Sequence, residues 1–172
     1  MRSPLMRRLG LTTVLALVLA VFGLAPAASA APAPAELTFT TDAATTTPGG
    51  TVNVAMTLTN NKTYDIWFVH QTIDPTWLTT QRPDLKYSFT GCTLTAPSGI
   101  SSCSGTADLG ANYGATIPPG QSRTVTLTLQ VAPDSGCNGN IGFYSYFYAE
   151  FSDATSVGGG PVHTPETRVL CA

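Results

Sequence analysis

The stretch Pro118–Val131, PPGQSRTVTLTLQV, decides the fold class of this chain. After the Pro-Pro-Gly turn signal, polar and apolar residues alternate without a break from Thr124 onward. Alternation with a period of two is typical of a β-strand with one face on a core and one in water. The residues predicted to point into the core are Val125, Leu127, Leu129 and Val131.

A second stretch repeats this pattern. Pro48-Gly49-Gly50 leads into Thr51–Asn60, TVNVAMTLTN, with apolar residues at every second position. Since each strand follows a Pro-Gly turn, we expect the two to form the central pair of a β-sandwich.

Other segments of the chain also have the composition of short strands. They are residues 36–42, 64–73, 85–94, 101–109, 141–151 and 167–171. Residues 153–165 contain three consecutive glycines and predict a mobile loop. Because no long amphipathic helix is present, the pattern predicts an all-β antiparallel sandwich of seven to eight strands.

The motifs Pro48–Asn60 and Ile117–Leu129 resemble those of bacterial immunoglobulin-like domains of secreted and cell-surface proteins. The resemblance is one of architecture and covers most of the chain. It implies an immunoglobulin-like antiparallel β-sandwich, which we expect to occupy residues 36–172. Such domains are usually stalks, adhesion elements or accessory modules.

The N-terminal residues predict export. Arg2, Arg7 and Arg8 precede an apolar run over 9–24, and Ala28-Ser29-Ala30 matches the small-residue pattern of a signal peptidase site. An uncleaved membrane anchor is the alternative, because the run is near the lower length limit for spanning. We favour a signal peptide over 1–30, followed by a Pro/Ala spacer over 31–35. The remaining chain is then secreted, with no membrane span.

The net charge of the exported chain limits the classes of partner that it can bind. Removing three arginines from the 8 basic residues leaves 5 against 10 acidic ones, a net charge of about −5. An acidic, sparsely charged surface argues against nucleic acid and anionic membranes as partners.

All four cysteines lie in the exported part, which fits disulfides formed in an oxidising compartment. Three pairings are possible. We favour Cys92–Cys103, because the segment between them contains a Pro-Ser-Gly turn, and Cys137–Cys171 as the second bridge. The spacing does not fit a zinc site, and no histidine is close in sequence to any cysteine.

The segment 141–151 contains the densest group of aromatic residues. Its alternation predicts Phe143, Phe147 and Phe151 in the core, with Ile141, and the other face carries the tyrosines Tyr144, Tyr146 and Tyr148. Exposed Tyr and Trp side chains can stack on sugars or form the centre of a protein interface.

Two tryptophans complete this candidate binding site. If Ile66 and Phe68 are buried, Trp67 and Val69 project onto the same face as the tyrosines. We expect the more common outcome, in which residues 74–84 cover this face and Trp77 packs on the tyrosines. An open binding face is the alternative.

The sequence offers little for catalysis or metals. His70 and His163 are the only histidines, and none of the familiar catalytic or phosphate-binding motifs is present. We interpret the scattered carboxylates as solvated turn residues rather than calcium ligands. A lysine–asparagine crosslink would have to use Lys62 or Lys86, and neither is clearly core-facing. We therefore expect no enzyme activity, metal or cofactor.

The prediction is a secreted, non-catalytic binding module that recognises a polysaccharide or a protein partner through an aromatic sheet face. Two alternatives stay open. One is a structural or interaction protein of the cell envelope surface, and the other is a carrier of a small apolar ligand.

Overall fold

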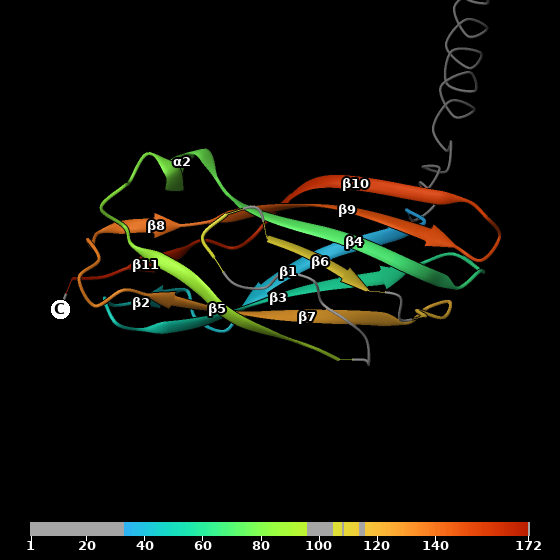
Figure 1. Cartoon of the computed structure of the whole chain (residues 1–172), viewed down its shortest axis with the longest axis horizontal. Coiled ribbons are helices and arrows are strands. Elements are labelled where there is room, and N and C mark those ends of the chain that lie inside the picture. The colour runs from blue at the N-terminus through green and yellow to red at the C-terminus, as the bar shows by residue number, and fades with distance from the viewer. Residues whose placement is uncertain (1–32, 96–104, 108, 114–115, 172) are drawn as a thin grey trace, which may run out of the picture. The chain divides into compact units, whose positions relative to one another are not determined.

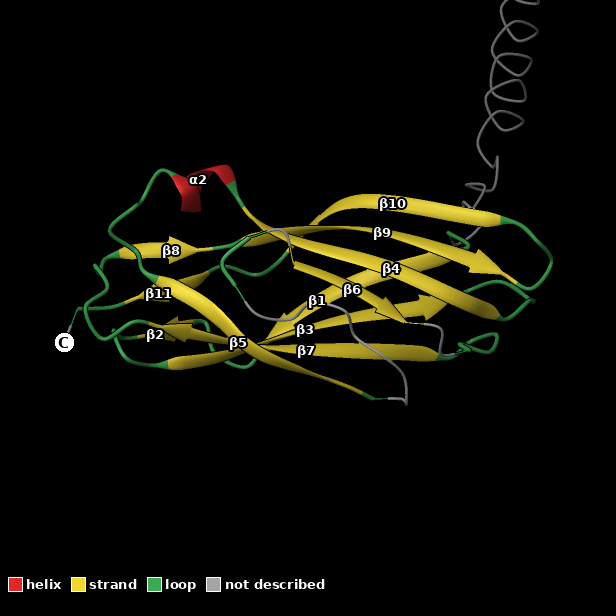
Figure 2. Cartoon of the chain, in the orientation of Figure 1, coloured by secondary structure: helices red, strands yellow, loops and turns green. Residues whose placement is uncertain are grey.

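The sandwich is built from two four-stranded sheets, with a smaller three-stranded sheet at one end (Figure 1). The structure is a computed structural model, and it describes residues 33–95, 105–107, 109–113 and 116–171. Within these residues strands dominate and helix is confined to one short turn (Figure 2). The predicted signal peptide lies outside the described residues, and the spacer over 31–35 lies partly outside them.

The first sheet contains the two strands that the alternating sequences predict. Its order is β1-β3-β7-β5, all antiparallel. The central pair is β3 (Thr51–Asn60) and β7 (Ser122–Val131), with β1 (Ala35–Thr41) and β5 (Tyr87–Leu94) outside them. Val54 lies opposite Leu127, and both are buried. The predicted central pair and its core face are therefore confirmed.

The second sheet carries the aromatic strand. Its order is β10-β9-β4-β6, also antiparallel. It is formed by β4 (Ile66–Pro75), β6 (Leu109–Tyr113), β9 (Phe143–Phe151) and β10 (Ser156–His163).

The third sheet has the order β2-β11-β8. β11 (Thr167–Val169) pairs parallel with β2 (Thr45–Thr46) and antiparallel with β8 (Gly139–Ile141). The single-turn helix α2 (Trp77–Thr80) lies on this end and contacts β8. The hydroxyl of Thr76 caps the helix by accepting a hydrogen bond from Thr79 N–H, 3.4 Å away.

The core lies between the inner faces of the two large sheets. Phe89 of the first sheet and Phe143 of the second are both buried, and their ring centroids are 4.9 Å apart. The buried Asn60 is satisfied, because its side-chain N–H₂ donates to the carbonyls of Tyr64 and Ile117 at 2.8 Å.

The described residues form eleven strands, so the predicted number of seven to eight is wrong. One reason is that the predicted strand 141–151 belongs to two sheets. Gly142 interrupts it by bonding to the helix region: its N–H donates to Thr79 Oγ1 at 2.9 Å, and its carbonyl accepts from Thr76 N–H at 2.9 Å. β8 therefore ends before β9 begins.

The predicted mobile loop over 153–165 is wrong for most of its length, because residues 156–163 form strand β10. Glycine is required there by packing. A Cβ on Gly159 would lie 2.5 Å from the Phe147 ring. The predicted strand over 101–109 falls largely outside the described residues, and the strand seen near it, β6, begins at Leu109.

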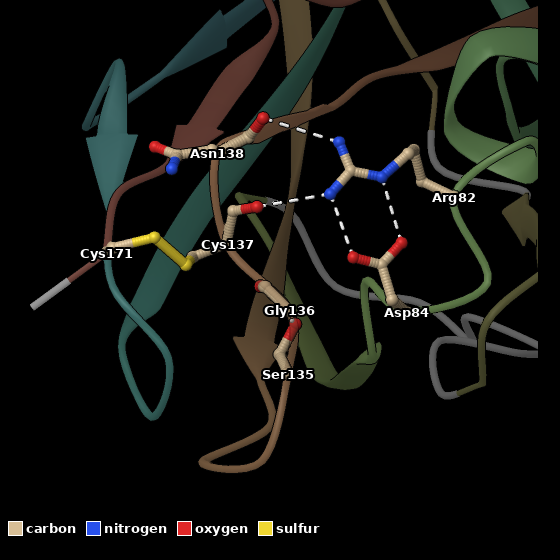
Figure 3. The surroundings of a disulfide bond; sticks show 7 residues. All are labelled: Arg82, Asp84, Ser135, Gly136, Cys137, Asn138 and Cys171. Carbon is tan, nitrogen blue, oxygen red and sulfur yellow. Dashed lines mark hydrogen bonds and ion pairs between the residues drawn. A yellow bond between two sulfur atoms is a disulfide. The ribbon is translucent and has the colours of Figure 1, made fainter.

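One disulfide lies within the described residues. It joins Cys137 to Cys171, with the Cα atoms 5.1 Å apart (Figure 3), as predicted. Cys92 is also disulfide-bonded. Its predicted partner Cys103 lies outside the described residues, so that pairing stays a prediction. Among the residues that the structure describes, no helix has the length and apolar character needed to cross a membrane.

Candidate functional site

The outer surface of the second sheet displays the predicted tyrosines. Along β9 every second residue, from Phe143 to Phe151, is buried. Tyr146 and Tyr148 point outward and are 48% and 39% exposed, while Tyr144 is partly buried. The predicted alternation of this strand is confirmed.

Strand β4 contributes polar neighbours to the same surface. His70 lies opposite Tyr148 and Asp74 lies opposite Tyr144, and directly paired residues of an antiparallel ladder share a face. We call this surface the tyrosine face. It is formed by Trp67, Phe68, His70, Thr72, Asp74, Tyr144, Tyr146, Tyr148 and Glu150.

Trp67 reaches the tyrosine face through an irregularity in β4. Ile66 pairs with Phe151 and Phe68 with Glu150, so Trp67 is an extra residue without its own partner on β9. Such a bulge redirects one side chain and reverses the alternation that follows. Trp67 is 50% exposed, as predicted, but Val69 is buried and Phe68 only partly buried. The predicted directions of Phe68 and Val69 are therefore wrong.

The expectation that Trp77 covers the tyrosine face is also wrong. Trp77 lies on α2 and is itself 69% exposed. Beside Tyr146 and Tyr148, strand β10 contributes glycines instead of side chains. Gly158 lies opposite Tyr148, and Gly160 contacts Tyr146. The tyrosine face therefore remains accessible beside both tyrosines.

The rings on the tyrosine face meet edge to face. Tyr144 and Tyr146 have centroids 5.9 Å apart and ring planes at 85°. His163 of β10 lies opposite Tyr144, with a centroid separation of 6.2 Å. Sequence reasoning missed His163 as a neighbour because its segment was predicted to be a loop.

A hollow of about 350 Å³ adjoins the tyrosine face where β9 turns into β10. Its aromatic and acidic walls come from Trp67, Tyr148, Glu150 and Phe151, and residues 152 and 154–156 complete the lining. The Tyr148 hydroxyl donates a hydrogen bond to Glu150 Oε1 at 3.0 Å. This hollow therefore combines a carboxylate with two exposed rings.

Lys62 lies close to the hollow, but its ammonium group is paired with Asp153. Its ammonium donates to Asp153 Oδ2 at 2.9 Å, hydrogen-bonds Thr155, and lies 4.6 Å from the Phe151 ring centroid. Hydrogen bonds from Thr155 and then from Lys62 lower the pKa of Asp153 to about 2. The residue that faces Lys62 is thus an ionised aspartate. A lysine–asparagine crosslink would need an asparagine at this place.

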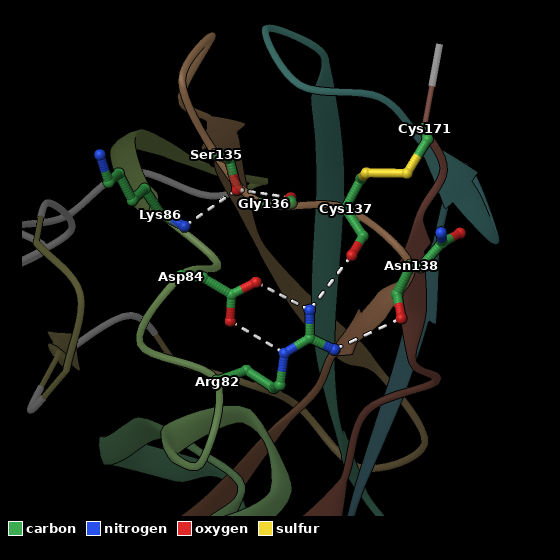
Figure 4. Close-up of polar contacts among 8 residues, drawn as sticks. All are labelled: Arg82, Asp84, Lys86, Ser135, Gly136, Cys137, Asn138 and Cys171. Carbon is green, nitrogen blue, oxygen red and sulfur yellow. Dashed lines mark hydrogen bonds and ion pairs between the residues drawn. A yellow bond between two sulfur atoms is a disulfide. The ribbon is translucent and has the colours of Figure 1, made fainter.

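A second polar cluster lies beside the disulfide (Figure 4). Arg82 binds Asp84 through two hydrogen bonds of 2.9 and 2.8 Å and also donates to the carbonyls of Cys137 and Asn138. The hydrogen bond with Arg82 lowers the pKa of Asp84, and the same contact raises that of Arg82. The guanidinium of Arg82 thus links Asp84 to the backbone on both sides of the Cys137–Asn138 peptide bond. We therefore interpret this cluster as structural.

Within the described residues, no three His, Cys, Asp or Glu side chains are grouped to hold a metal ion. Of the two histidines, His70 is hydrogen-bonded to Asn112 and His163 lies against Tyr144. The tyrosine face and its hollow are therefore the strongest candidate site.

No protein-family model matches the chain, and no curated protein matches it. Solved structures do share its fold. The sixth cohesin from scaffoldin B of Acetivibrio cellulolyticus, crystallised in complex with a dockerin, is 10% identical with a TM-score of 0.52 over 77% of this chain and 98% of that one. The seventh ScaB type I cohesin of Pseudobacteroides cellulosolvens is 11% identical, with a TM-score of 0.54 over 79% and 93%.

BcpA, the major pilin subunit of Bacillus cereus, is 7% identical with a TM-score of 0.56, and the match covers 80% of this chain and 40% of the pilin. At such identities the likeness is one of fold alone. It confirms the architectural resemblance seen in the sequence: the chain has an immunoglobulin-like β-sandwich fold, which these cohesins and this pilin subunit share.

Proposed function

We propose that the chain is an extracellular, non-catalytic module that binds a protein partner through the tyrosine face. The observation that carries the proposal is the exposure of Trp67, Tyr146 and Tyr148 together on one sheet surface. Tyrosine and tryptophan are the residues most enriched at the energetic centres of protein interfaces. The predicted signal peptide and the disulfide support an extracellular location.

The fold is compatible with this role. The cohesin of Acetivibrio cellulolyticus that shares it was crystallised with a protein partner, a dockerin. This is support by analogy of fold, and the partner of the present chain is a separate question.

A protein partner is favoured over a polysaccharide by the ring geometry. Sugars stack on flat, exposed ring faces, whereas Tyr144 and Tyr146 stand at 85° to each other. A small apolar ligand is not favoured, because the hollow beside Trp67 is lined by Glu150 and by hydroxyl-bearing residues. A second hollow, near the helix α2, is lined by charged and amide residues, among them Arg82, Glu166 and Arg168.

Photo-crosslinking tests the proposal. A photoreactive phenylalanine replaces Tyr146, and in a matched control it replaces Thr40, an exposed residue of the first sheet. The exported protein is mixed with envelope and medium fractions of the cells that produce it. We expect protein adducts from position 146 and none from position 40.

The variants Trp67→Ala and Trp77→Ala provide the second control. Trp67→Ala should reduce the adduct at least tenfold while lowering the melting temperature by no more than about 4 °C. Trp77→Ala should leave the adduct unchanged. In parallel, we measure how much of the protein is removed from solution by cellulose, chitin and cell-wall preparations. If the wild type is removed and Trp67→Ala is not, and no protein adduct forms, the partner is a polysaccharide.

A further inference from the structure

We infer that the hollow beside Trp67 accepts a cationic side chain, lysine or arginine, from the partner. The inference rests on the proposed function and adds the chemistry of the contact. It starts from the walls of the hollow, which place the Trp67 and Tyr148 rings around the Glu150 carboxylate. Aromatic faces and a carboxylate attract the same kind of group, a cation.

The Glu150 carboxylate has spare capacity to bind such a group. Its Oε1 accepts a hydrogen bond from Tyr148 at 3.0 Å. Within the described part of the chain Oε2 has no hydrogen-bond partner, and no lysine or arginine forms an ion pair with Glu150. The hydrogen bond from Tyr148 also fixes the carboxylate in position, which reduces the entropy lost when a cation binds.

The lysine that borders the hollow does not fill this role. Lys62 binds Asp153 at 2.9 Å and lies over the Phe151 ring. Charge complementarity therefore has to come from outside. The exported chain, with 5 basic and 10 acidic residues, favours a basic partner in general, and Glu150 gives that preference a specific point of contact.

The size of the hollow limits what enters it. A volume of about 350 Å³ is at the lower end of the range for ligand pockets, which is about 300–1,000 Å³. It suits one long side chain rather than a peptide segment. Ser152 and Ser156 also line the hollow, and serine hydroxyls can accept hydrogen bonds from a cation.

The test uses fluorescence of Trp67 in the exported Trp77→Phe protein, where Trp67 is the only tryptophan of the described residues. The probes are Nα-acetyl-arginine amide, Nα-acetyl-lysine amide and the neutral isostere Nα-acetyl-citrulline amide. We expect saturable changes with one or both cationic probes and none with citrulline; the stronger of the two identifies the preferred side chain.

Glu150→Gln should weaken cation binding at least tenfold. Glu166→Gln is the matched control, since Glu166 lines the other hollow and already accepts a hydrogen bond from Asn140. Equal binding of citrulline, no saturable change with any probe, or unchanged binding in Glu150→Gln would overturn the inference. A partner adduct at position 146 that persists in Glu150→Gln would leave the proposed function standing, so the two failures are distinguishable.

Discussion

Gly160 of β10 is in direct contact with Tyr146 of β9. A Cβ on Gly160 would lie 2.9 Å from Tyr146 Cδ1 and 2.6 Å from the carbonyl oxygen of Ser145, and the residue has φ of +119°. Only glycine satisfies both conditions. Tyr146 therefore lies beside a residue that has no side chain to cover it, and it is 48% exposed.

The first prediction compares two glycines of this strand. Gly160→Ala should lower the free energy of unfolding by about 1–3 kcal/mol, because it combines a forced backbone conformation with a clash. Gly158→Ala should be neutral or stabilising by up to about 1 kcal/mol, since its Cβ would be no nearer than 3.4 Å to any atom. Urea unfolding checks both, and equal losses would show that β10 is not positioned as described.

The second prediction tests the bulge in β4. Val69→Ala should lower the free energy of unfolding by about 1–3 kcal/mol, because Val69 is fully buried. Trp67→Ala should cost less than about 1 kcal/mol, as expected for a half-exposed side chain. If uninterrupted alternation held instead, Val69→Ala would have almost no effect on the unfolding curve.

The third prediction concerns the disulfide. Cys137 and Cys171 are 34 residues apart in sequence, so replacing both by serine should lower the free energy of unfolding by about 2–4 kcal/mol. Adding a reductant to this double variant should lower stability further, through loss of the bond at Cys92. A melting temperature insensitive to both changes would contradict the role assigned to the bridges.

The fourth prediction is a pH dependence. Since the folded pKa of Asp153 is about 2 and an unfolded aspartate has a pKa of about 3.9, the ionised Asp153 stabilises the fold above about pH 4. This stabilisation is lost as pH falls toward 2. The difference in urea midpoint between the wild type and Asp153→Asn should be largest near pH 6 and smallest near pH 2. A constant difference would mean that the pKa is not lowered.

The fifth prediction concerns processing. The intact mass of the protein recovered from the medium should correspond to a chain that begins at Ala31, because signal peptidase cleaves after the Ala-Ser-Ala motif. A chain that retains residues 1–30 and stays with the membrane fraction would favour the anchor alternative.

The strands β3 and β7 were predictable, because a Pro-Gly turn precedes each of them and the alternation of apolar residues along them is uninterrupted. β10 was not, because glycine and proline normally indicate loops. Its pairing with β9 uses backbone hydrogen bonds, which need no particular side chains, and its Gly159 is explained only by the position of the Phe147 ring.

The candidate site was predictable in part for a similar reason. The three tyrosines follow from the period of β9 alone. The direction of Trp67 was predicted correctly, but that of Val69 was not, because a bulge leaves no mark in a sequence that is apolar on both sides. The position of Trp77 depends on how α2 is capped and bound to Gly142, a contact between segments 63 residues apart.

The border position of β10 also bears on solubility. β10 is the edge strand of its sheet, and an edge with free N–H and C=O groups can recruit strands of neighbouring molecules. Pro161 has no N–H to offer, and the register between β9 and β10 shifts between Gly159 and Val162. The strand that leaves the tyrosines uncovered therefore also resists edge-to-edge aggregation. The chain can expose an aromatic surface without its sheet adding strands from other molecules and growing into a fibril.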